Sequence, residues 1–117
     1  MNVIDYQNWS ISTAVYPGAG EHGFNEALYL TLGLSSESGE VAGKVKKIIR
    51  GDKVDPESLV SEMSDVLWYL TRMCDNLGFN LEDLADYSYK KLESRKKAGS
   101  IQREDQKDGS RIITNNT

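Results

Sequence analysis

Apolar residues recur three or four positions apart along most of the chain, which is the spacing of one face of an α-helix. No β-branched run alternates with polar residues as it would in a half-buried strand. Four segments carry the helical spacing, and we expect helices over about 3–16, 25–50, 55–77 and 80–97. The pattern therefore predicts an all-α fold, a four-helix bundle.

Helix-ending and helix-capping residues support these boundaries. Proline and glycine at 17–18 end the first segment, and glycines follow the second and third segments at 51 and 78. The residues expected at the N-caps of the last three helices are Asn25, Asp55 and Asn80. Pro56 follows Asp55 at the first helical position, where its missing N–H costs nothing.

The helical pattern is lost after Lys97. We therefore expect a helical domain over residues 1–97 and a polar C-terminal tail over 98–117. The tail is rich in charged and amide side chains, so we expect it to be a flexible, solvated segment. Its scattered basic residues leave open that it closes over a bound ligand as a lid.

Composition narrows the function. A chain of 117 residues with 38% hydrophobic and 27% charged residues is typical of one soluble domain. A net charge of −4 argues against binding to a nucleic acid polymer. No apolar stretch is long enough for a membrane span, and no leader pattern opens the chain, so we expect a cytoplasmic protein. A single cysteine, Cys74, which we expect in the core, and a single histidine, His22, provide no zinc site.

Glu37 is an anomaly in the second segment. On a helical wheel it lies within the apolar stripe that includes Leu34 and Val41. A carboxylate on such a face is costly unless a partner compensates for its burial. Glu40 lies one turn further along, at the edge of the same stripe, so the two side chains point in nearly one direction.

The third segment repeats this arrangement with Glu62 and Asp65, on a polar stripe that continues to Tyr69, Arg72 and Asn76. If the two helices pack side by side, four carboxylates converge. Either some of them then stay protonated or cations lie between them. Oxygen ligands select hard cations, Mg²⁺ or Mn²⁺ before zinc. One such pair alone is usually only a solvated helix face, and two pairs on consecutive helices favour a metal site.

Three stretches resemble motifs of the MazG-like all-α nucleoside triphosphate pyrophosphohydrolases. Gly33–Gly43 resembles the first motif, usually written EExxE, and Ser61–Leu70 resembles the second, ExxD. Lys91–Lys96 matches the closing KLxxR pattern. The resemblance extends from about Leu28 to Lys97.

The resemblance implies cleavage of nucleoside triphosphates between the α and β phosphates, which gives a monophosphate and pyrophosphate. It implies that Mg²⁺, with Mn²⁺ as a possible substitute, is held by Glu37, Glu40, Glu62 and Asp65. An activated water attacks the α-phosphorus, with Glu37 and Glu40 as the catalytic pair. We favour Glu37 as general base because burial raises the basicity of a carboxylate.

Four residues outside the metal site are predicted to bind substrate. Lys91 and Arg95, one turn apart, could neutralise the β and γ phosphates, and Tyr69 could stack on the base. Ser88 stands where many members of the family have Asn near the substrate, and Ser36 replaces the first Glu of EExxE. Lys44 and Lys47 could neutralise phosphates in the same way, but we expect them to be solvated surface residues.

The resemblance also bears on the oligomeric state and on the substrate. The family forms dimers or tetramers, so we expect a homo-oligomer that completes the core, with a tetramer favoured. Trp68 lies opposite the apolar stripe, which indicates a subunit interface. The alternatives are a phosphoribosyl-ATP pyrophosphohydrolase of the same scaffold and a non-catalytic helical adaptor. A di-iron protein is disfavoured because His22 lies outside both motifs.

Overall fold

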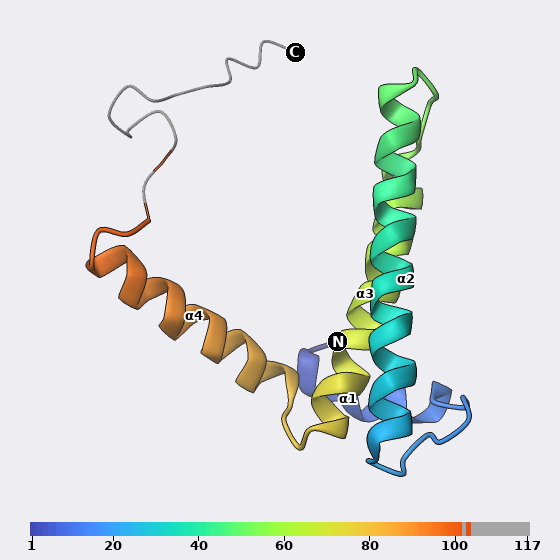
Figure 1. Ribbon diagram of the computed structural model, residues 1–117, viewed down its shortest axis with the longest axis vertical. Helices are drawn as coiled ribbons and strands as arrows, with labels where there is room; N and C mark the ends of the chain where they lie inside the picture. The colour runs from blue at the N-terminus through green and yellow to red at the C-terminus, as the bar shows by residue number, and fades with distance from the viewer. Residues whose placement is uncertain (102, 104–117) are drawn as a thin grey trace. The chain divides into compact units, whose positions relative to one another are not determined.

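The computed structural model describes residues 1–101 and 103. They form four α-helices and one short 3₁₀-helix, and no strand occurs among them (Figure 1). The elements in chain order are α1 (Val3–Ser10), η1 (Ile11–Thr13), α2 (Phe24–Ile49), α3 (Pro56–Asn76) and α4 (Leu81–Lys97). The all-α prediction is therefore confirmed. None of the helices in this part of the chain is both long and apolar enough to cross a bilayer.

The chain divides into two compact units, Met1–Leu84 and Ala85–Thr117. Met1–Leu84 is called the first unit and Ala85–Thr117 the second. The first unit holds α1, η1, α2, α3 and the first residues of α4, and the second holds the rest of α4. The tail predicted over 98–117 lies mostly outside the described residues, so its lid-like or flexible character stays a prediction.

Helices α2 and α3 pack along each other and make the most extensive contact between elements (Figure 1). A short connection joins them, which makes them antiparallel neighbours. Gly51 begins this connection in the left-handed region, with φ +95°, where a side chain would be strained. Asp55 ends it as the N-cap of α3, and its Oδ1 accepts the Glu57 N–H at 3.1 Å.

The caps predicted for the third and fourth helices are confirmed. Pro56 is the first residue of α3, and Asn80 and Asp83 accept each other's backbone N–H at the start of α4. The cap predicted for the second helix is wrong by two residues. Gly23 is the N-cap, in extended conformation, and α2 begins at Phe24.

The first helix is shorter than its apolar pattern predicts. It ends at Ser10 rather than at Tyr16, and a 3₁₀ turn follows. Three hydroxyl groups here donate to carbonyls three residues back, from Ser10 to Gln7, from Ser12 to Trp9 and from Thr13 to Ser10, at 2.7–2.9 Å. Such side-chain hydrogen bonds compete with the backbone hydrogen bonds of an α-helix. This competition explains why α1 ends at Ser10 and continues as a 3₁₀ turn.

The interior of the first unit combines a few apolar side chains with buried polar ones. Leu30 is fully buried, and Cys74 is buried as predicted. Gln7 connects α1 to the turn before α4, since its Nε2 donates to the Phe79 carbonyl and its Oε1 accepts the Leu81 N–H. Buried amides satisfied in this way fix the relative positions of the elements they join.

Glu26 anchors the loop that precedes α2. Its carboxylate is almost fully buried and accepts the Tyr16 hydroxyl at 2.5 Å and the backbone N–H groups of Gly20 and His22 at 2.7 and 2.9 Å. Burial alone raises the pKa of Glu26, but these three hydrogen bonds hold it below its ordinary value. Burial and the same carboxylate raise the pKa of Tyr16 to about 12.

Arg72 and Trp68, both on α3, face into the first unit. Arg72 is 3% exposed and donates to the Ser10 hydroxyl at 3.1 Å and to Asp75 at 2.7 Å. The outward position predicted for Trp68 is wrong. Its ring is half-buried, its Nε1 donates to the Thr13 hydroxyl at 2.8 Å, and it meets Tyr16 edge-on. The 3₁₀ turn after α1 supplies this partner, and periodicity could not reveal it.

Candidate functional site

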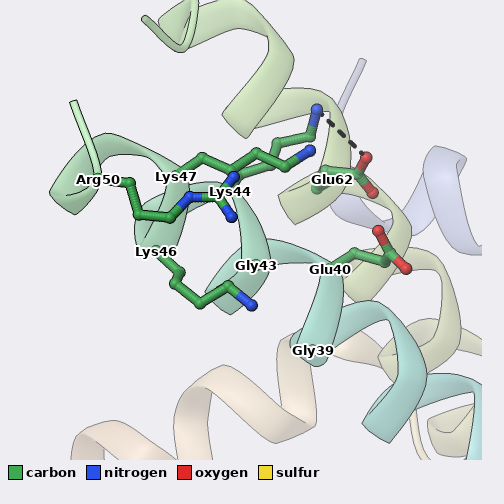
Figure 2. A pocket seen from close by; sticks show the side chains of 8 residues that line it. All are labelled: Gly39, Glu40, Gly43, Lys44, Lys46, Lys47, Arg50 and Glu62. Carbon is green, nitrogen blue, oxygen red and sulfur yellow. Dashed lines mark ion pairs between the residues drawn. The ribbon is translucent and has the colours of Figure 1, made fainter. Parts of the chain in front are cut away.

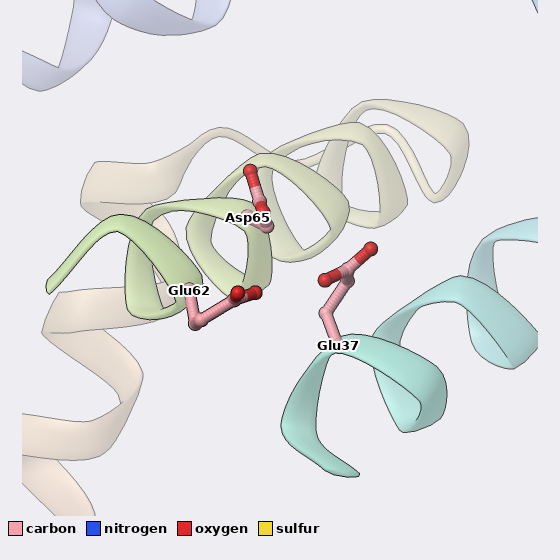
Figure 3. A group of neighbouring side chains, drawn as sticks. All are labelled: Glu37, Glu62 and Asp65. Atoms are coloured by element: carbon pink, nitrogen blue, oxygen red, sulfur yellow. The ribbon is translucent and has the colours of Figure 1, made fainter. Parts of the chain in front are cut away.

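Three of the predicted acidic residues converge between α2 and α3. Glu37 projects from α2, and Glu62 and Asp65 project from successive turns of one face of α3 (Figure 3). One carboxylate oxygen from each lies within 4.8 Å of the other two. We call these three residues the acidic cluster. They meet because the antiparallel packing places the middle of α2 against the middle of α3.

The electrostatics of the acidic cluster favour a cation. Glu37 and Glu62 are half-buried, whereas Asp65 is exposed. Burial raises the pKa of Glu37, and the nearby charges of Asp65, Glu62 and Glu40 raise it further. A hard divalent cation among the oxygens relieves this repulsion, and an all-carboxylate donor set fits Mg²⁺ or Mn²⁺.

Glu40 takes a different position from the other three predicted ligands. It is exposed and lies three residues beyond Glu37, so it is displaced along and around α2. Its charge still reaches Glu37 and contributes to the raised pKa there. The acidic cluster thus holds three of the four predicted ligands, and Glu40 borders the adjoining space. Its metal-binding and catalytic roles stay predictions.

That adjoining space is a cleft of about 250 Å³ along the C-terminal half of α2, with Glu62 of α3 at one end (Figure 2). Its basic lining comes from the last turns of α2, with Lys44, Lys46, Lys47 and Arg50. Gly39 and Gly43 complete the α2 side, and Glu40 and Glu62 border the end next to the acidic cluster. We call this space the basic cleft. Seven of its eight lining residues lie within 39–50, and only the position of Glu62 depends on how α3 packs.

Lys44 connects the basic cleft to the acidic cluster. Its Nζ lies 3.7 Å from a Glu62 carboxylate oxygen and donates to the Ser58 hydroxyl at 2.5 Å. The expectation that Lys44 is a solvated surface residue is therefore wrong, since its side chain is only 24% exposed. The sequence does contain a signal. Lys44 lies seven residues after Glu37 and four after Glu40, on the same helix face.

Tyr69 packs next to the acidic cluster, one turn after Asp65. It is half-buried against Gly33 so closely that a Cβ added there would lie 2.1 Å from the Tyr69 Cε1 atom. Trp68 meets it edge-on with ring centroids 5.0 Å apart. Burial raises the pKa of Tyr69, with Tyr29, Glu37 and Asp65 adding to the shift. Its contact with a substrate base stays a prediction.

The other predicted substrate-binding residues lie in the second unit. Ser88, Lys91 and Arg95 are on α4, and all three are exposed. Their role in substrate binding stays a prediction.

Fold and site together define a class of protein, an all-α chain with clustered carboxylates on two packed helices. The comparisons identify the family. Residues 25–100 match the MazG nucleotide pyrophosphohydrolase domain, and this match spans more than half of the chain. The chain therefore belongs to the MazG family, as its motifs predict.

One relative comes from a bacteriophage. The chain is 40% identical over 108 residues to "Gene 37 protein" of Mycobacterium phage L5, across 87% of this chain and 95% of that protein. No solved structure matches the chain. The name of the phage protein states no activity. Membership of the MazG family supports a nucleotide pyrophosphohydrolase activity in general terms and leaves the substrate open.

Proposed function

We propose that this protein hydrolyses nucleoside or deoxynucleoside triphosphates between the α and β phosphates, with Mg²⁺, to a monophosphate and pyrophosphate. The observation that carries this proposal is the convergence of Glu37, Glu62 and Asp65 within 4.8 Å. A MazG domain over 25–100 supports the same reaction class. Removal of non-standard or surplus nucleotides is the purpose that fits such an activity.

The acidic cluster is the proposed metal site, and Glu40 adds a ligand from its edge. Mg²⁺ bound there supplies charge neutralisation and polarisation of the phosphate oxygens. Glu62 forms an ion pair with Lys44 at 3.7 Å beside Glu37. Asp65 is exposed and would supply a third carboxylate to the metal.

Glu37 is the proposed general base. Half-burial and three neighbouring carboxylates raise its pKa, which makes it a stronger proton acceptor than an ordinary glutamate. It takes one proton from the attacking water while the water oxygen bonds to the α-phosphorus. The bond from that phosphorus to the bridging oxygen breaks, and pyrophosphate leaves with the bond electrons.

A product analysis tests the proposal. The protein is incubated with ribo- and deoxynucleoside triphosphates and with phosphoribosyl-ATP, in Mg²⁺ or in chelator, and the products are separated. We expect a monophosphate and pyrophosphate, only with the metal. Diphosphate and phosphate, or no turnover of any substrate, would reject the proposal and leave the non-catalytic adaptor.

Glu40→Gln tests the ligand assignment within this assay. Loss of one carboxylate at the metal site should lower kcat/KM by roughly a hundredfold or more while helical content is unchanged. Glu21→Gln, an exposed loop position with the same change of charge, is the matched control. Near-normal turnover by Glu40→Gln would show that Glu40 is not a ligand.

A further inference from the structure

The basic cleft holds most of the positive charge of the first unit. Six lysine and arginine residues occur in Met1–Leu84, and four of them line the basic cleft. Of the other two, Arg72 is buried and bonded to Ser10 and Asp75, and Lys53 lies in the connection after α2. In a chain with a net charge of −4, such a concentration creates a local positive potential that attracts anions.

The basic cleft is continuous with the acidic cluster. Glu62 belongs to both, and Lys44 lies between them at 3.7 Å from that carboxylate. Figure 2 shows Glu40 and Glu62 together at one end, with the basic side chains over the rest of the lining. An anion in the basic cleft would therefore lie directly beside cations held by the acidic cluster.

Two glycines leave room for a ligand. Gly39 and Gly43 are one turn apart on α2, and a Cβ added at either position meets no atom within 4 Å. Glycine within a helix costs about 1 kcal/mol relative to alanine, so packing inside this unit does not account for the pair. Open space next to several basic side chains can accommodate an anionic ligand whose oxygen atoms approach the backbone of α2.

The register of the antiparallel α2–α3 pair places different kinds of residue on the two sides of the acidic cluster. Lys44 pairs with Ser58 on the side of the acidic cluster toward the end of α2. Gly33 meets Tyr69 on the opposite side. Cations therefore lie on one side of the acidic cluster and aromatic rings on the other. Lys44 is seven residues from Glu37, about 10 Å along the helix axis, which a long side chain and a phosphate chain can span.

We propose that the basic cleft binds the β- and γ-phosphoryl groups of the substrate and holds pyrophosphate after cleavage. The inference rests on the proposed function, and it assigns the orientation of the substrate at that site. The nucleoside lies toward Tyr69, the α-phosphoryl group at the acidic cluster, and the terminal phosphates toward Lys44 and Lys47.

Binding of inorganic pyrophosphate tests the inference without turnover. Its affinity is measured by calorimetry with Mg²⁺ for the unaltered protein and for Lys47→Gln. Loss of one charge-assisted contact should weaken pyrophosphate binding about tenfold. Lys53→Gln carries the same change of charge outside the basic cleft, and it should stay within about twofold of the unaltered protein. Equal affinities for Lys47→Gln and Lys53→Gln would overturn the inference.

A second variant tests whether pyrophosphate needs the open space at Gly43, rather than the positive charge of Lys47. Gly43→Leu fills the basic cleft with a good helix former, so it should fold and bind pyrophosphate more weakly. Ala42→Leu, at an exposed neighbouring position, is its control and should leave the affinity unchanged. If Gly43→Leu bound pyrophosphate as tightly as Ala42→Leu, the ligand would not occupy the basic cleft.

Inhibition by the nucleoside monophosphate tests the orientation. Lys47→Gln should leave the inhibition constant of the monophosphate unchanged. If this variant bound monophosphate and pyrophosphate more weakly by the same factor, the proposed direction of the substrate would be overturned. If no triphosphate is hydrolysed but Lys47→Gln still binds pyrophosphate tenfold more weakly, the proposed function fails and the polyphosphate site stands. If a triphosphate is hydrolysed but Lys47→Gln binds pyrophosphate normally, the proposed function stands and the polyphosphate site fails.

Discussion

At the scale of single residues, the energetic cost of half-burying the Glu37 carboxylate is linked to its role in the proposed metal site. This carboxylate is half-buried between Leu34 and Val41 of the apolar stripe, with Glu62 and Asp65 opposite. Burial and like charge both favour its protonated form. A divalent cation reverses this preference, because it interacts most strongly with the ionised carboxylate. Stability, metal affinity and pH are therefore linked through this residue.

The first prediction concerns this linkage. The folded protein raises the pKa of Glu37 above its ordinary value of 4.5, so the folded state binds the proton more tightly than the unfolded state. Without metal, Tm should therefore fall relative to Glu37→Gln as pH rises from about 4.5 through the raised pKa. Saturating Mg²⁺ should remove this difference for the unaltered protein, because it compensates for the ionised carboxylate.

Thermal unfolding between pH 4.5 and 7.5, with Mg²⁺ and with chelator, measures both effects. The Mg²⁺-dependent gain in Tm should grow with pH for the unaltered protein and be much smaller for Glu37→Gln. A gain independent of pH, or equal in both proteins, would contradict the link between Glu37 and the metal.

At the scale of elements, the pairing of α2 and α3 positions the site. Contacts between Lys44 and Ser58 and between Gly33 and Tyr69 fix how far one helix is displaced along the other. Glu37 lies between these contacts on α2, and Glu62 and Asp65 lie between them on α3. The small size of Gly33 allows the tyrosine ring to approach the helix backbone, so this glycine sets the spacing of the acidic cluster.

The second prediction compares two glycines of α2. Gly33→Ala should destabilise the protein by about 1–3 kcal/mol, because the new Cβ would lie 2.1 Å from Tyr69 and the ring must move. Gly39→Ala meets nothing within 4 Å, and it should stabilise the protein by up to about 1 kcal/mol through helix propensity. Urea unfolding monitored by circular dichroism measures both, and equal effects of the two substitutions would show that the Tyr69 contact does not constrain α2.

Local signals in the sequence were enough for most of the elements. Asp55 with Pro56, and Asn80 with Asp83, gave the starts of α3 and α4, because capping depends on residues three or fewer positions apart. The early end of α1 was missed, because apolar periodicity does not register hydroxyl groups that bond to the backbone.

The site was only partly predictable for a related reason. Glu37, Glu62 and Asp65 stood out because each lies on or beside an apolar stripe. Glu26 and Arg72 lie on the same helix faces, but the sequence does not predict their burial, because it depends on Tyr16 and Ser10, which lie 10 and 62 positions away. The sequence marks Lys44 and Lys47 as residues that could neutralise phosphates, but only the packing of α3 against α2 places Glu62 beside them.

At the scale of the whole molecule, large apolar side chains remain exposed in the described part of the chain. Phe24 is 78% exposed, Ile49 81% and Tyr87 72%. Few side chains larger than alanine are fully buried, and a chain of this length has little interior of its own. We propose that copies of this chain cover part of this surface in a homo-oligomer, a tetramer before a dimer.

The third prediction is the mass in solution. Sedimentation velocity at micromolar concentration should give about four times the chain mass of 13.1 kDa, or about twice that mass for a dimer. Association that buries apolar surface should persist at high salt, which screens charge contacts and spares hydrophobic ones. A monodisperse monomer under these conditions would contradict the proposed assembly.

The most direct test of the proposed reaction is hydrolysis in water enriched in oxygen-18, with Mg²⁺ and a nucleoside triphosphate that the protein turns over. Attack on the α-phosphorus beside Glu37 predicts that the heavy oxygen enters the monophosphate and that pyrophosphate stays unlabelled, as mass spectrometry of the separated products would show. Label in pyrophosphate or in inorganic phosphate, with none in the monophosphate, would contradict it.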